Sequence, residues 1–131
     1  VGPATRAELR QVAAELKFPR GVPDRVAEAL HTKFMAPQLF VVSQVRSDDA
    51  FTSKEDYAAT SCAIQNLCLS LADDGLGSKW STGGVTRDPR TYALVGVDPA
   101  LEEIVGFVWF GHPAEERPRP ERDPLVVRSV P

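Results

Sequence analysis

The sequence predicts an α+β domain, in which helices pack on a small, mostly antiparallel sheet around one long helix. No charged residue occurs between Asp56 and Asp73, although 25% of the 131 residues are charged. A helix in this stretch is therefore expected to be buried on nearly every side. Two apolar runs, 38–45 and 103–111, are typical of strands. The predicted order is α-α-β-α-(β)-α-β, then an arm and a final short strand.

Length and composition predict a single domain over residues 1–131, with residues 112–131 as an extended arm. The formal net charge is −3 and the pI about 5.4, and no stripe of Lys and Arg points to nucleic acid. No uninterrupted apolar run is long enough to span a membrane. Cys62 and Cys68 lie about 120° apart around one helix, so they cannot pair locally, and we expect both in the core. Unpaired thiols favour a reducing, cytoplasmic compartment.

Two amphipathic helices are expected first, both as surface cover. The first runs from Pro3 to Lys17, and Thr5 with Glu8 has the form of a capping box. A break rich in proline and glycine follows. The second helix is expected from residue 23 or 24 to about Lys33.

The apolar run 38–45 predicts a strand that is buried on both faces. The polar residues 46–53 predict a loop. Ser53 is a candidate N-cap of the long helix, with Asp56 placed favourably in its first turn.

The long helix, 57–74, is expected to have two distinct faces. The face toward the sheet is predicted to comprise Tyr57, Ile64, Leu67, Cys68 and Leu71. A second face is a seam of small residues, Ala59, Ala63, Asn66 and Ser70. Such a seam lets another helix approach closely. That helix could belong to the same chain or to a second copy across a two-fold axis, and the sequence favours neither.

Gly75 is the expected C′ residue of the long helix, and an extended segment should follow it. Thr86 is a candidate N-cap of a short helix that ends at Gly96 and serves as a lid rather than as core. Gly106, inside the strand 103–111, marks a place where another group packs closely on the backbone. The tail 125–130 resembles a short strand on a proline-rich arm, well placed to join the sheet of a partner subunit.

Two stretches carry a resemblance to a known family. They are SCAIQNLCLSLADDGLGSKWSTGG, which starts at Ser61, and LVGVDPALEEIVGFVWFGHPAEERPRPER, which ends at Arg122. Their succession resembles the C-terminal portion of the nitroreductase family of FMN-dependent oxidoreductases, over roughly residue 37 to the C-terminus. The family's usual N-terminal R-R-S-x-R segment, which holds flavin phosphate and ribityl groups, has no counterpart here. We therefore expect the chain to be N-terminally incomplete relative to the family.

The resemblance implies a flavin site in the loop after the long helix. The positions that match the family's flavin-contacting loop are Trp80, Ser81, Thr82 and Gly83. Small residues let the backbone approach the ring, and neutral N–H donors favour the charge that develops on reduction. The alternative is a glycine-rich turn on which Trp80 merely packs. Arg122, with Arg119 second, matches the tail arginine that reaches the FMN phosphate; the alternative is a solvated charge on the arm.

The implied function is an NAD(P)H oxidoreductase that reduces nitroaromatics, quinones or similar electron-poor acceptors by a ping-pong reaction. No catalytic side chain is required, because the chemistry resides on flavin N5, and no metal is expected. The resemblance also implies a homodimer with a small-molecule acceptor. The alternative function is a non-catalytic dimerisation or binding domain that has lost FMN.

Overall fold

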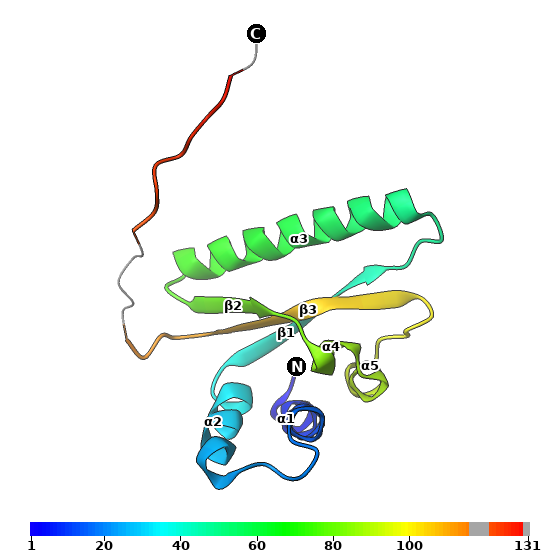
Figure 1. The fold of residues 1–131 in the computed structure, drawn as a ribbon, viewed down its shortest axis with the longest axis vertical. Helices are drawn as coiled ribbons and strands as arrows, with labels where there is room; N and C mark the ends of the chain where they lie inside the picture. Colours follow the sequence, from blue (N-terminus) through cyan, green and yellow to red (C-terminus); the bar gives the residue numbers. More distant parts are fainter. Residues whose placement is uncertain (116–120, 130–131) are drawn as a thin grey trace.

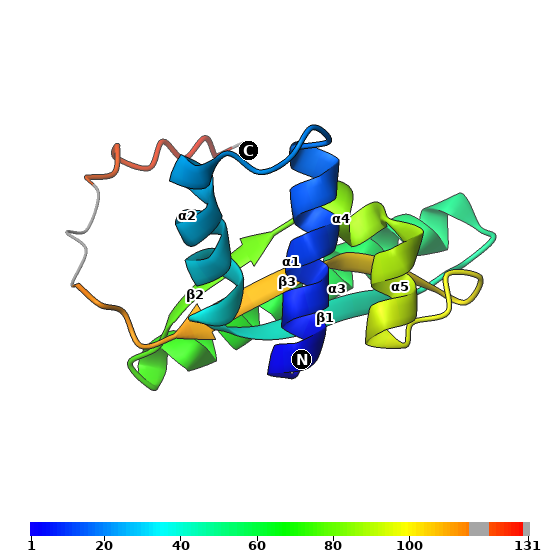
Figure 2. The ribbon, with the colours of Figure 1, turned by 90° about the horizontal axis from the view of Figure 1, so that it is seen from below.

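The computed structural model describes residues 1–115 and 121–129. A three-stranded antiparallel sheet has helices on both of its faces, which confirms the predicted α+β class (Figure 1). Helix α3 lies along one face, and the other helices lie on the opposite face (Figure 2). The elements are α1 (Pro3–Lys17), α2 (Asp24–Met35), β1 (Gln38–Val45), α3 (Ala50–Asp73), β2 (Gly77–Ser81), α4 (Gly84–Arg87), α5 (Pro89–Val95) and β3 (Glu102–Gly111).

Strand β3 is the centre of the sheet, between β1 and β2. The prediction of a strand at 103–111 is confirmed, with one more residue at its start. Val42 of β1 pairs with Gly106, but the next residue, Ser43, pairs with Ile104. Val105 is thus the extra residue of a β-bulge, which turns the side chains around it and bends the strand.

The predicted bounds of α1 are confirmed, but its predicted capping box is wrong. Gly2 is the N-cap and Pro3 the first helical residue, and no side chain caps the helix. Because proline favours the first helical position, the helix starts before Thr5, which already lies inside the first turn. Helix α2 runs to Met35, two residues beyond the expected end.

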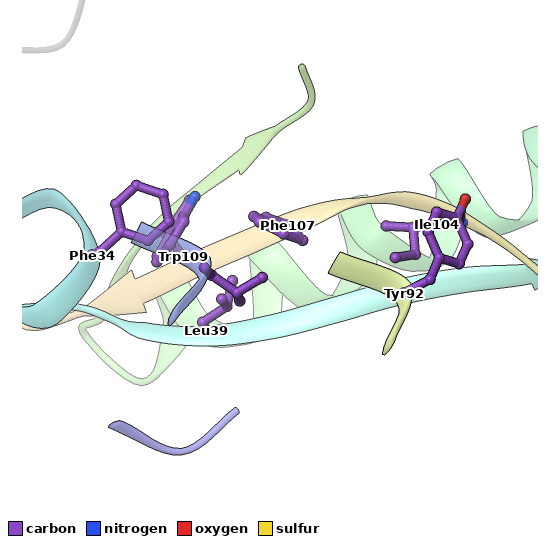
Figure 3. Close-up of a cluster of buried hydrophobic side chains, with 7 residues drawn as sticks. Phe34, Leu39, Tyr92, Ile104, Phe107 and Trp109 are labelled. Carbon is purple, nitrogen blue, oxygen red and sulfur yellow. Dashed lines mark hydrogen bonds between the residues drawn. The ribbon is translucent and has the colours of Figure 1, made fainter. Parts of the chain in front are cut away.

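The larger core cluster lies between the sheet and the helices opposite α3 (Figure 3). It comprises Leu9, Phe34, Leu39, Tyr92, Ile104, Phe107 and Trp109. Leu9 and Phe34 show that α1 and α2 are core elements and not merely surface cover. Tyr92 shows the same for α5, which was expected to be a lid. Its hydroxyl accepts a hydrogen bond from the Ile104 N–H at 3.1 Å.

The bounds of β1 are as predicted, but its predicted burial on both faces is wrong. Leu39 is buried in the core, whereas its neighbour Phe40 remains 41% exposed. The Phe40 ring stacks on Phe110 of β3 with centroids 4.6 Å apart. Phe40 lies on the face of the sheet that α3 covers. In the described part of the chain, no other helix lies on that face, and α3 covers only part of the three strands (Figure 1).

Helix α3 is longer and more exposed than the sequence predicts. It begins at Ala50, and the carboxylate of Asp49, rather than Ser53, caps it by accepting the Thr52 N–H at 2.7 Å. Ile64 and Leu71 are its buried residues. The expectation of burial on nearly every side is therefore wrong. Alanine, serine, threonine, asparagine and glutamine supply much of this uncharged stretch, and such residues tolerate water.

The two expected faces of α3 fare differently. On the sheet face, Leu67 and Cys68 are partly buried beside Ile64, but Tyr57 is 47% exposed, contrary to prediction. All four residues of the small-residue seam are exposed, so no helix within residues 1–115 and 121–129 covers them. Both cysteines are free, but Cys62 is exposed, and its predicted place in the core is wrong.

The end of α3 follows the prediction closely. Gly75 has a φ of +74°, and its N–H donates to the Ala72 carbonyl at 3.1 Å. The Leu76 N–H donates to the Leu71 carbonyl at 2.8 Å, which completes a Schellman motif.

The segment expected to be one helix from Thr86 to Gly96 is instead two short helices. Thr86 lies inside α4 and is not an N-cap. Asp88 separates α4 from α5 and accepts the Arg90 N–H at 2.9 Å. Pro89 explains the break, because a residue before proline is disfavoured in the helical region. The predicted end at Gly96, with a φ of +71°, is confirmed.

Residues 121–129, the described part of the C-terminal arm beyond residue 115, lie apart from the sheet and the helices (Figure 1). Residues 121–129 contain neither helix nor strand, so the strand predicted at 125–130 is absent over 125–129. Residue 130 lies outside the described residues. Leu125 and Val126 are 88% and 91% exposed. Among the described helices, none combines the length and apolar character needed to cross a membrane.

Candidate functional site

The four predicted loop residues lie where β2 ends and the chain turns toward α4. Trp80 and Ser81 are the last two residues of β2, and Thr82 and Gly83 connect the strand to α4. In the pairing with β3, Trp80 stands opposite Val108 and Ser81 opposite Phe107. Because side chains alternate along a strand, Trp80 and Ser81 point to opposite faces of the sheet.

Trp80 lies in a notch that Gly106 leaves in the surface of β3. A Cβ atom at position 106 would stand 2.2 Å from the Trp80 Nε1 and 2.8 Å from its Cδ1. The same atom would stand 3.0 Å from the Ser81 carbonyl oxygen. The prediction that another group packs closely on the backbone at Gly106 is confirmed, and the group is the indole. Trp80 remains 36% exposed.

Ser81 is held from the other face by the second tryptophan of the chain. The Trp109 Nε1–H donates a hydrogen bond to the Ser81 Oγ at 2.9 Å. Trp109 is 6% exposed and belongs to the larger core cluster. Sequence reasoning missed this pair, and a single sequence carries no signal for it, because it depends on the register between β2 and β3.

Gly83 has a backbone conformation that favours glycine, with a φ of +149°. Its carbonyl accepts hydrogen bonds from the Thr86 N–H at 3.2 Å and the Thr86 Oγ1 at 2.9 Å. A Cβ atom at Gly83 would meet nothing within 4 Å. The Gly83 carbonyl is therefore held by Thr86, whereas the space where a side chain would stand at position 83 is open.

A charged cluster fixes the start of α5 just beyond this loop. Arg90 forms ion pairs with Asp88 of its own turn and with Glu15 of α1. Hydrogen bonds from the Arg90 side chain lower the pKa values of Asp88 and of Glu15 below their ordinary range. The Arg90 and Glu15 side chains are about half exposed, at 49% and 50%, so we assign the cluster a positional role and little stability.

The tail arginine is not brought to this loop. Arg122 is exposed within residues 121–129, which lie away from the sheet in Figure 1, and Arg119 lies outside the described residues. In the described residues, the loop expected to contact the flavin ring therefore lies apart from the arginine expected to bind the phosphate. Among residues 1–115 and 121–129, no group of three His, Cys, Asp or Glu side chains is arranged to hold a metal ion.

The loop has the properties needed to meet a planar, electron-poor ring. Residues 80–86 carry no charged side chain. Their backbone is open at Gly83 and anchored by Ser81 and Thr86. A fixed, neutral backbone can offer N–H donors to a ring edge without rearranging. In these respects the residues present fit the ring portion of a flavin.

Comparison with known proteins decides the family. The sequence model of the Nitroreductase family matches residues 3–112. The chain belongs to the nitroreductase family. This match extends the resemblance seen in the sequence, which started near residue 37, back to α1.

Individual nitroreductase-family relatives agree with this assignment. The Bacillus subtilis (strain 168) protein named "Putative NAD(P)H nitroreductase YfhC" is 27% identical over 110 residues, which cover 81% of this chain and 56% of that protein. This chain therefore spans little more than half the length of that relative.

Two solved structures share the fold. A nitroreductase-like family protein from Bacillus cereus is 23% identical with a TM-score of 0.71, over 91% of this chain and 63% of that one. Oxidized iodotyrosine deiodinase bound to FMN and 3-iodo-L-tyrosine is 24% identical with a TM-score of 0.66, over 97% of this chain and 71% of that one.

Proposed function

We propose that this chain acts as an FMN-dependent NAD(P)H oxidoreductase that reduces nitroaromatics, quinones or similar electron-poor acceptors. Family membership supports the class, and the name of the Bacillus subtilis relative supports NAD(P)H as the electron donor. The FMN in the iodotyrosine deiodinase structure supports the choice of flavin. The observation that carries the proposal is the open, neutral loop 80–83, held in place from both faces of the sheet.

In this proposal, Trp80, Ser81, Thr82 and Gly83 hold the ring edge of FMN. FMN, when bound, would supply hydride transfer from NAD(P)H to the acceptor in a ping-pong sequence. The loop backbone would contribute N–H donors, which favour negative charge on the ring, and Gly83 would leave room for close approach. Arg122 on the arm would bind the phosphate, because a guanidinium offers a fork of donors that matches it, with Arg119 as the second candidate.

We also propose that two copies pair through the small-residue seam of α3. The seam residues Ala59 and Ala63 are exposed in a stretch without charge, and Leu69 on the same helix is 59% exposed. A row of small, uncharged residues on an exposed helix face lets a second helix approach closely. Pairing would also let the arm of one copy carry Arg122 to a site on the other, which supports a site shared between subunits.

The substitution Ala63→Arg tests the pairing. Because Ala63 is exposed in the single chain, the arginine should leave the fold intact but place a large charge in the seam. Sedimentation analysis should show a dimer for the wild type and a monomer for the variant. Ala72→Arg is the matched control, since Ala72 is exposed on the same helix about 180° from Ala63. A wild-type monomer, or dimers of all three proteins, would contradict the seam as the interface.

Purified protein with added FMN tests the activity. The proposal predicts a yellow protein with flavin absorbance, and oxidation of NADH or NADPH that accelerates when a quinone or nitroaromatic is added. A second candidate, the non-catalytic dimerisation or binding domain, is favoured by the exposure of Arg122 in a segment without helix or strand. A colourless protein that gains no NAD(P)H oxidation from FMN would favour that candidate and reject the enzyme.

A further inference from the structure

The end of β2 is fixed from both faces of the sheet by the two indole side chains of the molecule. On one face, the Trp80 ring lies against the bare backbone of Gly106. On the other face, the Trp109 indole N–H donates to the Ser81 hydroxyl at 2.9 Å. Two consecutive residues of an edge strand are thus tied to the central strand β3 by their side chains, in addition to the backbone pairing.

Trp109 is itself immobilised by aromatic neighbours. Its ring meets Phe34 of α2 edge to face, with centroids 5.1 Å apart and an interplanar angle of 79°. It meets Phe107 in the same way at 5.9 Å and 81°. Figure 3 shows Trp109 beside Phe34 at the end of the sheet near α2. Because such edge-to-face pairs have a preferred geometry, they restrict where the indole N–H can point.

Because the Trp109 ring is held in the core, its hydrogen bond to Ser81 also holds the start of the loop in place. A buried indole N–H needs an acceptor, and the Ser81 Oγ is the acceptor that the structure provides. Two residues further on, the Gly83 carbonyl is held by Thr86. The backbone between these anchors has little freedom left. A loop that is already ordered avoids the entropy cost of ordering when it binds a ligand.

We propose that Trp109 is a positioning residue for ligand binding by loop 80–83, acting through the Ser81 hydroxyl. Trp109 lies in the core and does not itself contact the ligand. Its indole N–H sets the backbone of β2's last residue, and thereby the direction of the N–H groups that follow. This inference rests on the proposed function, in which the ligand at that loop is FMN.

The test compares Trp109→Phe and Ser81→Ala, singly and together, in the 131-residue chain. Trp109→Phe keeps an aromatic ring beside Phe34 but removes the donor, and Ser81→Ala removes the acceptor. Titration of FMN, followed by the quenching of flavin fluorescence, should show affinity lowered about five- to tenfold by each single change, because the loop must then be ordered when it binds FMN. The double variant should be no weaker than either single variant, because both remove the same interaction.

Two controls separate positioning from general stability. Ser78→Ala makes the same change at an exposed position of β2 and should leave FMN affinity unchanged. Ser81→Thr keeps the hydroxyl and should retain most of the wild-type affinity. In the ligand-free protein, the amide protons of Thr82 and Gly83 should exchange faster in Trp109→Phe and Ser81→Ala than in wild type, whereas those of α3 should not change.

Each outcome decides a different claim. The inference is supported if the wild type binds FMN, both single variants bind it more weakly, and the double variant is no weaker than they are. The amide protons of the loop should then also exchange faster in the single variants. If both single variants bind FMN as tightly as the wild type, the role of Trp109 is overturned but the proposed function stands. Failure of the wild-type chain to bind FMN overturns the proposed function, and with it the ligand-binding role of Trp109. Loss of affinity in Ser78→Ala equal to that in Ser81→Ala would also overturn the inference.

Discussion

The notch at Gly106 makes a quantitative prediction for the substitution Gly106→Ala. The new Cβ would stand 2.2 Å from the Trp80 Nε1 and 3.0 Å from the Ser81 carbonyl oxygen. The indole can swing toward solvent because it is already 36% exposed, but the backbone oxygen cannot move without disturbing the β2–β3 pairing. We therefore expect the free energy of unfolding to fall by about 1–3 kcal/mol, the usual cost of overpacking.

Urea unfolding followed by tryptophan fluorescence measures this change, and Gly111→Ala is the matched control in the same strand. A Cβ at position 111 meets its nearest neighbour, the Pro37 Cα, at 3.8 Å, an ordinary contact. The control should change stability by about 0.5 kcal/mol or less. The change Trp80→Val should relieve only the part of the cost of Gly106→Ala that comes from the indole, because the close contact with the Ser81 carbonyl oxygen remains. Equal free energies of unfolding for Gly106→Ala and Gly111→Ala would refute the claim that position 106 has no room for a side chain.

Two further predictions concern the scaffold. Tyr92→Phe leaves the buried Ile104 N–H without the hydroxyl that accepts it, and should lower the free energy of unfolding by about 1–3 kcal/mol; Tyr57→Phe, at an exposed position, should be neutral in the same urea titration. Asp49→Ala removes the cap of α3 and should lower the melting temperature relative to the exposed control Asp48→Ala. Hydrogen bonds from the Thr52 side chain and backbone lower the pKa of Asp49 below its ordinary value of 3.8. Its contribution should therefore be complete above pH 3.8 and decline as the pH falls through the depressed pKa, so a difference between wild type and Asp49→Ala that grows in acid would contradict this cap.

The sequence predicts best the elements that are set by local chemistry. Pro3 fixes a helical φ at the start of α1, where its missing N–H costs nothing, and Gly75 adopts a positive φ that few other residues favour at the end of α3. The structure confirms both predicted boundaries. The apolar run of β3 and the close approach at Gly106 follow from residue type alone. By contrast, the prediction of Thr86 as an N-cap is wrong, because α4 already starts at Gly84. Pro89 then keeps Asp88 out of the helical region, which divides the segment into α4 and α5.

Burial and long-range pairing are what the sequence does not determine. The uncharged stretch of α3 suggests a helix buried inside the chain, but Cys62 and Tyr57 are exposed, because no second layer lies over α3 in the described residues. An uncharged stretch can be buried at little cost, but the surface that buries it can belong to a partner as well as to the chain's own core. The bond between Trp109 and Ser81 depends on the strand register, which places residues distant in sequence side by side.

The central claim, that loop 80–83 binds FMN, is tested most directly by titrating FMN into wild-type protein, Gly83→Ala and Gly21→Ala. Both glycines have positive φ angles, +149° and +103°, so alanine strains the backbone at either position. Position 83 is in the proposed site, whereas Gly21 lies in the loop between α1 and α2. The claim predicts saturable binding of FMN by wild type and Gly21→Ala, and a loss of affinity of about tenfold or more for Gly83→Ala. Equal FMN affinity in all three proteins, or no binding by wild type, would contradict it.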